Sequence, residues 1–146
     1  MLVILWLPVL LAVVSLVVNL GNLLVDRARL QASADLAALA AVQSVDWDAM
    51  AEGDVRLVEE LADLEARDYS MANVQSLMDV DPEEIFVWIV NASTDDPTPH
   101  PVTGGTLEHP TVILRRRAPG PGGLLTAAFG GVSMEAEADA SIRPRE

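Results

Sequence analysis

A run of 25 residues without a charged side chain opens the sequence, from Met1 to Val25. About 20 consecutive apolar residues are enough to cross a bilayer as a helix, so the run predicts a transmembrane helix. Residues 26–50 are rich in Ala and Leu and lack Gly and Pro, which favours continuation of the same helix until Gly53. At about 1.5 Å per residue, the helix would be about 75 Å long. Because this length exceeds that of a bilayer with its headgroups, the second half must lie against protein.

A row of polar residues crosses this stretch on one helix face. Its members follow one another at steps of three and four: Ser15, Asn19, Asn22, Asp26, Arg29 and Ser33. Polar side chains are costly in hydrocarbon and usually turn toward another protein segment, where Asn and Ser form hydrogen bonds between helices. A second interpretation is that Asn19 and Asn22 contact lipid headgroups at the membrane surface. We favour the first interpretation and expect helix–helix assembly through the row from Ser15 to Arg29.

The charge balance restricts the possible partners. All charged residues follow Val25, so the remainder of the chain carries the whole net charge of −13. Phosphate binding needs a basic surface, which argues against a nucleic-acid partner. Cysteine is absent, and this excludes a thiol enzyme, a Cys-ligated metal and a disulfide framework. The roughly 95 to 120 residues outside the apolar run allow one small domain.

A helix is predicted at the start of that domain. Between Asp54 and Gln75, apolar residues recur at helical spacing with acidic residues between them. Asp54 is a suitable N-cap, and Asp63 and Arg67 are spaced to form an i, i+4 ion pair. The apolar stripe should pack on a sheet. Pro82 should end the helical region, because it disfavours helical geometry in the residue before it.

Three stretches have the character of strands. Glu83–Asn91 is rich in β-branched and aromatic residues at odd and even positions, which predicts a central strand covered on both faces. Thr111–Arg117 is a second strand. Val132–Ile142 alternates apolar with acidic or polar residues, as in a strand with an acidic outer face. Residues 92–110 contain four prolines and two adjacent glycines and predict a surface loop, and residues 124–129 form a short apolar segment.

The N-terminal part of the chain resembles a known family. Leu7-Pro8 in the apolar run precedes VVNLGNLLVDRARLQASADLAALAAVQ, residues 17–43, which is similar to the signature of TadE/TadG-like proteins of the Tad (tight adherence) type IV pilus system. The pattern R-x-x-LQ-x-x-AD-x-AALAA is matched by Arg27, Leu30, Gln31, Ala34, Asp35, Ala37, Ala38, Leu39, Ala40 and Ala41. A weaker similarity covers residues 112–117, Phe129 and residues 132–140.

The resemblance implies an α+β protein in which a long N-terminal helix carries a small head, one amphipathic helix on a roughly three-stranded antiparallel sheet. The implied parts are a transmembrane or filament-core helix (1–25), a helical stalk (26–53) and the head (54–146). It further implies a structural subunit, major or minor, of an extracellular adhesive pilus, which forms a homopolymer or joins other pilus subunits after a stage in the inner membrane. The alternative is a membrane-anchored accessory protein or binding module that does not polymerise. Arg27 and Arg29 alone favour a head on the inner side, but the resemblance implies export to the outer side.

Catalysis has little support in the sequence. His100 and His109 lie in the proline-rich loop, where we expect exposed side chains without a catalytic role. The four acidic side chains within residues 79–84 (Asp79, Asp81, Glu83 and Glu84) offer oxygen ligands for calcium. The stretch lacks the glycine and the length of an EF-hand loop, which favours a solvated turn. Asn91 fits a glycosylation pattern that is frequent by chance, and we expect it to end a strand. We therefore expect no enzymatic activity, no cofactor and no metal.

Three consecutive cations in a very acidic chain call for acidic neighbours: Arg115, Arg116 and Arg117. In one interpretation they pair across the sheet with Glu135 and Glu137 of the same chain. In the other they contact acidic residues on the predicted helix of a neighbouring subunit, Glu59, Glu60 and Asp63. The sequence favours neither interpretation over the other.

Overall fold

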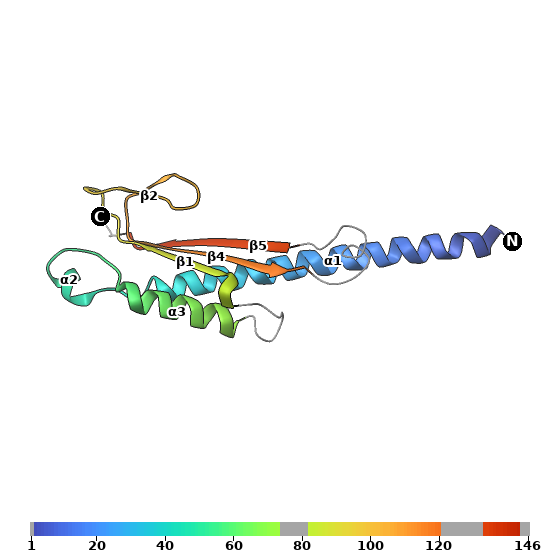
Figure 1. Ribbon diagram of the computed structural model, residues 1–146, viewed down its shortest axis with the longest axis horizontal. Helices are drawn as coiled ribbons and strands as arrows, with labels where there is room; N and C mark the ends of the chain where they lie inside the picture. Colours follow the sequence, from blue (N-terminus) through green and yellow to red (C-terminus); the bar gives the residue numbers. More distant parts are fainter. Residues whose placement is uncertain (1, 74–81, 121–132, 144–146) are drawn as a thin grey trace.

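The computed structural model describes residues 2–73, 82–120 and 133–143, with the backbone alone for residues 2–5 and 82. Its helices are α1 (Leu2–Ala41), α2 (Trp47–Ala51), α3 (Glu59–Ala72) and the 3-10 helix η1 (Pro82–Glu84). Its strands are β1 (Ile85–Val90), β2 (Thr98–Pro99), β3 (Thr106–Leu107), β4 (Thr111–Pro119) and β5 (Ser133–Ser141). The N-terminal half of α1 projects from a head formed by its C-terminal half and the other elements (Figure 1). The predicted α+β class, a long apolar helix followed by a head with a helix and a three-stranded antiparallel sheet, is confirmed.

Helix α1 ends at Ala41, well before the predicted stop. The residues that follow turn into a backbone pairing with residues 56–58. The N–H of Val58 donates to the carbonyl of Ser44 (2.9 Å), and the N–H of Asp46 donates to that of Arg56 (3.0 Å). The side chain of Asp46 also caps the N-terminus of α2. These long-range bonds and the cap override the helix propensity of the Ala-rich sequence.

Helix α3 begins at Glu59 instead of the predicted Asp54. The Asp54 carboxylate lies 3.4 Å from Arg56 Nε and does not cap the helix. The predicted pair between Asp63 and Arg67 is confirmed, with Arg67 Nε 3.0 Å from the Asp63 carboxylate. Both side chains are more than a third exposed, so the pair adds only a few tenths of a kcal/mol, roughly.

The three long strands pair antiparallel in the order β1-β4-β5. The prediction that β1 is central was wrong, because β4 lies between the other two strands and β1 is an edge. Strand β1 is apolar on both faces for a different reason. Its inner row, with Ile85 buried, packs on the core, and Phe86 and Trp88 on the outer face stack with ring centroids 6.2 Å apart.

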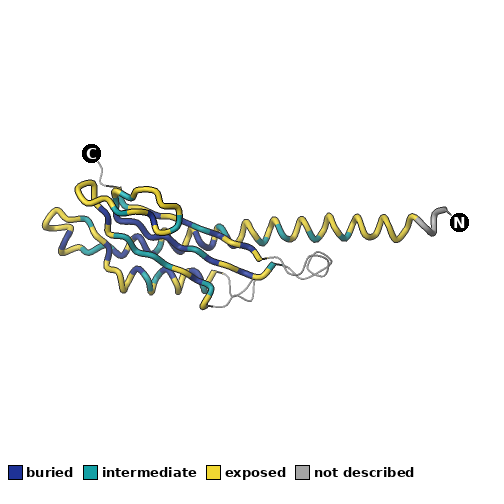
Figure 2. The backbone as a smooth tube through the Cα atoms, turned by 45° about the horizontal axis from the view of Figure 1, so that its top comes forward, coloured by how far each residue is buried: buried dark blue, intermediate teal, exposed yellow. Residues whose placement is uncertain are grey.

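The core lies between the sheet and the pair of helices α1 and α3, which run antiparallel along the same face (Figures 1 and 2). Helix α1 supplies Leu30 and a row of fully buried alanines, among them Ala34 and Ala37. Helix α3 supplies Ala62 and Ala66. Small side chains on both helices allow close approach, so α3 packs on α1 as well as on β1.

Residues 92–110, predicted as a loop, contain a short hairpin in which β2 pairs with β3. Its turn is closed by hydrogen bonds between the backbones of His100 and Gly105 (2.6 Å) and of Gly104 and His100 (2.9 Å). Gly104 has a φ of 71°, a left-handed conformation that suits glycine. Of the predicted solvated acidic turn at 79–84, residues 79–81 lie outside the described residues, as does the apolar segment at 124–129, and Glu83 and Glu84 belong to η1.

Candidate assembly site

The N-terminal half of α1 exposes apolar side chains on all sides. Large residues along it, such as Trp6 and Leu24, are 62% and 58% exposed. The helix is long and apolar enough to cross a membrane. An apolar surface of this extent is not stable in water, so lipid or other helices must cover it.

The predicted polar row on α1 passes from this projecting half into the head. Ser15, Asn19 and Asn22 have no side-chain hydrogen bond within the described residues. The Asp26 carboxylate lies 3.8 Å from the guanidinium of Arg29 on the next turn. Ser33, at the end of the row, is buried in the head and donates to the carbonyl of Leu30 (3.1 Å). The polar groups nearest the head thus have partners within the chain, whereas the three in the apolar half need a partner from outside.

Two of the three consecutive arginines lie on the outer face of the sheet. Arg115 Nε donates to Glu135, and Arg117 Nη2 lies 3.9 Å from the same carboxylate. The register sets Arg115 opposite Glu137 and Arg117 opposite Glu135. The hydrogen bond from Arg115 lowers the pKa of Glu135, and that bond also raises the pKa of Arg115. The structure therefore contains the pairing within the chain, one of the two interpretations that the sequence left open.

Arg116 points the other way and is completely buried between the sheet and the helices. Its Nη1 atom donates to the carbonyl (2.6 Å) and hydroxyl (2.8 Å) of Ser70 on α3 and lies 3.5 Å from the hydroxyl of Ser33 on α1. Its Nε and Nη2 atoms have no hydrogen-bond partner among the described residues. Burial lowers the pKa of Arg116. The structure thus removes Arg116 from the predicted surface contacts, because neighbouring residues of a strand point to opposite faces.

The acidic residues proposed as partners lie on α3, on the other side of the sheet from Arg115 and Arg117. Glu59 and Glu60 are exposed at the start of that helix, and Asp63 is paired with Arg67. Contact between these two sets is impossible within one chain. Contact between two chains stays a prediction.

His100 is buried, so the prediction of an exposed loop histidine was wrong for this residue. Its Nδ1 accepts hydrogen bonds from the backbone N–H groups of Val102 (3.2 Å) and Thr103 (3.1 Å). Its Nε2 must therefore carry the proton and donate to Asp139 on β5, 3.1 Å away. No sequence pattern indicates this contact, because Asp139 is 39 residues away from His100.

A metal ion at His100 is disfavoured by the same hydrogen bonds. The side chains of His100, Glu137 and Asp139 offer ligand atoms within 4.8 Å of one another. A metal on Nε2 requires the proton to move to Nδ1, where it would face two N–H donors. The donor set fits a hydrogen-bonded link between the hairpin and β5 better than an ion.

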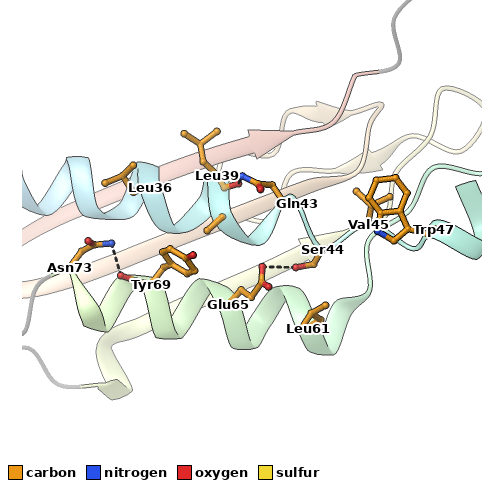
Figure 3. Close-up of a pocket in the computed structure, with 11 residues that line it drawn as sticks. Leu36, Leu39, Gln43, Ser44, Val45, Trp47, Leu61, Glu65, Tyr69 and Asn73 are labelled. Atoms are coloured by element: carbon orange, nitrogen blue, oxygen red, sulfur yellow. Dashed lines mark hydrogen bonds between the residues drawn. The ribbon is translucent and has the colours of Figure 1, made fainter.

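A groove of about 760 Å³ lies between α1 and α3 (Figure 3). Its lining residues come from both helices and from the segment after α1: Leu36, Leu39, Ala40, Gln43, Ser44, Val45, Trp47, Leu61, Glu65, Tyr69 and Asn73. The Ser44 hydroxyl donates to Glu65 (2.8 Å) across it. The sequence interpretation missed this groove, although Leu36 and Leu39 fall off the buried alanine face of α1 and could have signalled it.

Comparison with known families gives a match over the helix on which these surfaces lie. Residues 1–44 of the 146 match the family described as putative Flp pilus-assembly TadE/G-like. Comparisons with curated proteins and with solved structures find no match. The family match covers α1 and not the remainder of the head. The predicted resemblance is confirmed, since the N-terminal segment that contains α1 matches the TadE/G-like pilus-assembly family.

Proposed function

We propose that the chain is a structural subunit of a Tad-type pilus, anchored in the membrane by α1 before assembly and carrying its head on the outer side. The family match supports a pilus-related role, and the apolar half of α1 supports a membrane stage. The proposed role is structural and not catalytic. The proposal does not distinguish a major from a minor subunit.

The observation that carries the proposal is the continuity of α1. One uninterrupted helix of 40 residues forms both the projecting apolar half and, from Leu30 to Ala41, a wall of the head core. Packing of the projecting halves would therefore fix the heads in a regular array, since no hinge separates the two parts of the helix. A simple anchor has no need of such a rigid connection.

The polar residues of the apolar half add a preference for assembly. In lipid, Ser15, Asn19 and Asn22 lack partners, whereas a helix bundle can supply them at about 0.6 to 2 kcal/mol per hydrogen bond. Leucine and valine side chains are equally stable in lipid and in a helix bundle. The polar residues therefore favour the bundle, and the hydrophobic residues allow both states.

Filaments sheared from cells test the proposal. Cells producing the chain with an exposed epitope should release filaments that bind antibody along their length in electron micrographs. A chain without residues 2–25 is the matched control and should be absent from filaments. Label confined to rare positions would indicate a minor subunit. Unlabelled filaments, with the chain retained in the membrane fraction, would overturn the proposal and favour a non-polymerising accessory protein.

A further inference from the structure

We propose that the groove between α1 and α3 binds residues 16–27 of α1 from a second copy of this chain. The inference rests on the proposed function and identifies the contact between successive subunits. The groove is lined by side chains that remain exposed in the single chain. Leu36, Leu61 and Tyr69 are 53%, 44% and 51% exposed, and Trp47 at one end is 70% exposed. Several large apolar side chains left exposed along one groove are typical of an interaction site.

The matching surface lies on the other side of the same helix. Leu16, Leu20 and Leu24 follow at steps of four and are 48%, 50% and 58% exposed. Positions 16 residues apart point about 160° apart around a helix with about 3.6 residues per turn. Leu20 therefore points away from Leu36, and Leu24 away from Ala40.

Two complementary surfaces on opposite sides of one helix produce head-to-tail contacts. Each chain offers its leucine face (Leu16, Leu20 and Leu24) to the groove of one neighbour and its own groove to the next. Contacts of this type extend into an open helical filament unless the rotation closes a ring. The geometry thus agrees with a subunit that polymerises.

Length and charge also agree with this occupant. The α3 wall from Leu61 to Asn73 is about 18 Å long, and the segment from Leu16 to Arg27 is about 16 Å long, at about 1.5 Å per residue. Arg27 is exposed and has no ion pair or hydrogen bond within the described residues. The groove lining includes the carboxylate of Glu65, and so the arginine that follows the leucine face would meet negative charge.

Cysteine cross-linking can test this contact without reaction at native thiols, because the chain contains no cysteine. We expect Leu61→Cys combined with Leu20→Cys in one chain to give a ladder of multimers with a short bis-maleimide. Each chain then has one thiol in the groove and one on the leucine face. Either substitution alone should give monomers, since neither surface meets itself.

Val18 supplies the matched control, because it is similarly exposed (54%) but points away from Leu20 on the same turn. Leu61→Cys with Val18→Cys should give several-fold less ladder, and Arg27→Glu should weaken the ladder of the first pair. Equal ladders from both pairs, or dimers from Leu61→Cys alone, would overturn the proposed contact. Filaments without a ladder would overturn the contact and leave the proposed function intact. A ladder of multimers in cells that form no filaments would support the proposed contact and overturn the proposed role as a filament subunit.

Discussion

Arg116 on β4 donates to both the carbonyl and the hydroxyl oxygen of Ser70 on α3, at 2.6 and 2.8 Å. The guanidinium is completely buried, and its acceptors among the described residues are neutral. A buried cation without a carboxylate is costly. We therefore expect the contact to position α3 along β4 more than to stabilise the fold.

Replacement of Arg116 by methionine should be tolerated. Replacing a whole buried ion pair by apolar side chains is often neutral or stabilising, by about 1 to 4 kcal/mol, and Arg116 lacks, among the described residues, even the carboxylate partner that would offset its desolvation. We expect Arg116→Met to unfold at the same or a higher denaturant concentration than the wild type. Arg116→Ala is the control and should be less stable than Arg116→Met by about 2 to 5 kcal/mol because it leaves a cavity. A methionine variant as unstable as the alanine variant would show that the hydrogen bonds to Ser70 are needed for folding.

Low pH should lower the free energy of unfolding in part by protonating Glu135 on the outer face of the sheet. Arg115 holds the folded-state pKa of Glu135 below its ordinary 4.5, so the pair stabilises the folded chain above that pH. The stabilisation is lost as the pH falls through the lower folded-state pKa. We expect Glu135→Gln to remove part of the decrease in unfolding free energy between about pH 6 and 3. The side chains of Arg115 and Glu135 are 36% and 39% exposed, so added salt should reduce this pH-dependent stabilisation.

The control for this titration is Glu60→Gln, because Glu60 is exposed and forms no ion pair within the described residues. Urea denaturation of the two variants and the wild type across the pH range gives the comparison. Identical pH profiles for the wild type and Glu135→Gln would contradict the assigned pairing.

Loss of the His100 side chain should make the hairpin of β2 and β3 open more often. In His100→Ala, the N–H groups of Val102 and Thr103 lose their acceptor and Asp139 loses its donor. We expect the amides of residues 98–107 to exchange hydrogen for deuterium faster, while those of β4 and β5 keep their protection. Asp139→Asn, which retains an acceptor for Nε2, should have the smaller effect. Unchanged exchange in His100→Ala would show that other contacts hold the hairpin.

Asn19→Leu combined with Asn22→Leu should separate insertion from assembly. The double variant removes groups that need partners in lipid, so insertion into the membrane should be unchanged or improved. Filament yield should fall, because the bundle loses hydrogen bonds that lipid does not provide. Membrane fractionation and quantified sheared filaments measure the two effects. Normal filament yield from this variant would exclude a role of the two asparagines in assembly.

The sequence by itself determined the features that depend on local spacing. A charge-free run of 25 residues allows few environments other than lipid or a helix bundle, and α1 has the predicted apolar character. Alternation in residues 132–142 predicted a strand with an acidic outer face, and β5 has it. The spacing of Asp63 and Arg67 predicted their ion pair. In each case the interacting residues are close in sequence, so the pattern contains the information.

Only the tertiary structure decided the features that depend on distant contacts. The end of α1 at Ala41 follows from the backbone bonds of Ser44 and Asp46 to residues 56–58, which override a strong local helix propensity. The burial of Arg116 follows from the pairing of β4 with β5, which places the arginine in the same inner row as the alanines of β5. A sequence pattern separates the two faces of a strand or helix. The element that packs on each face is set by long-range packing, which local periodicity does not encode.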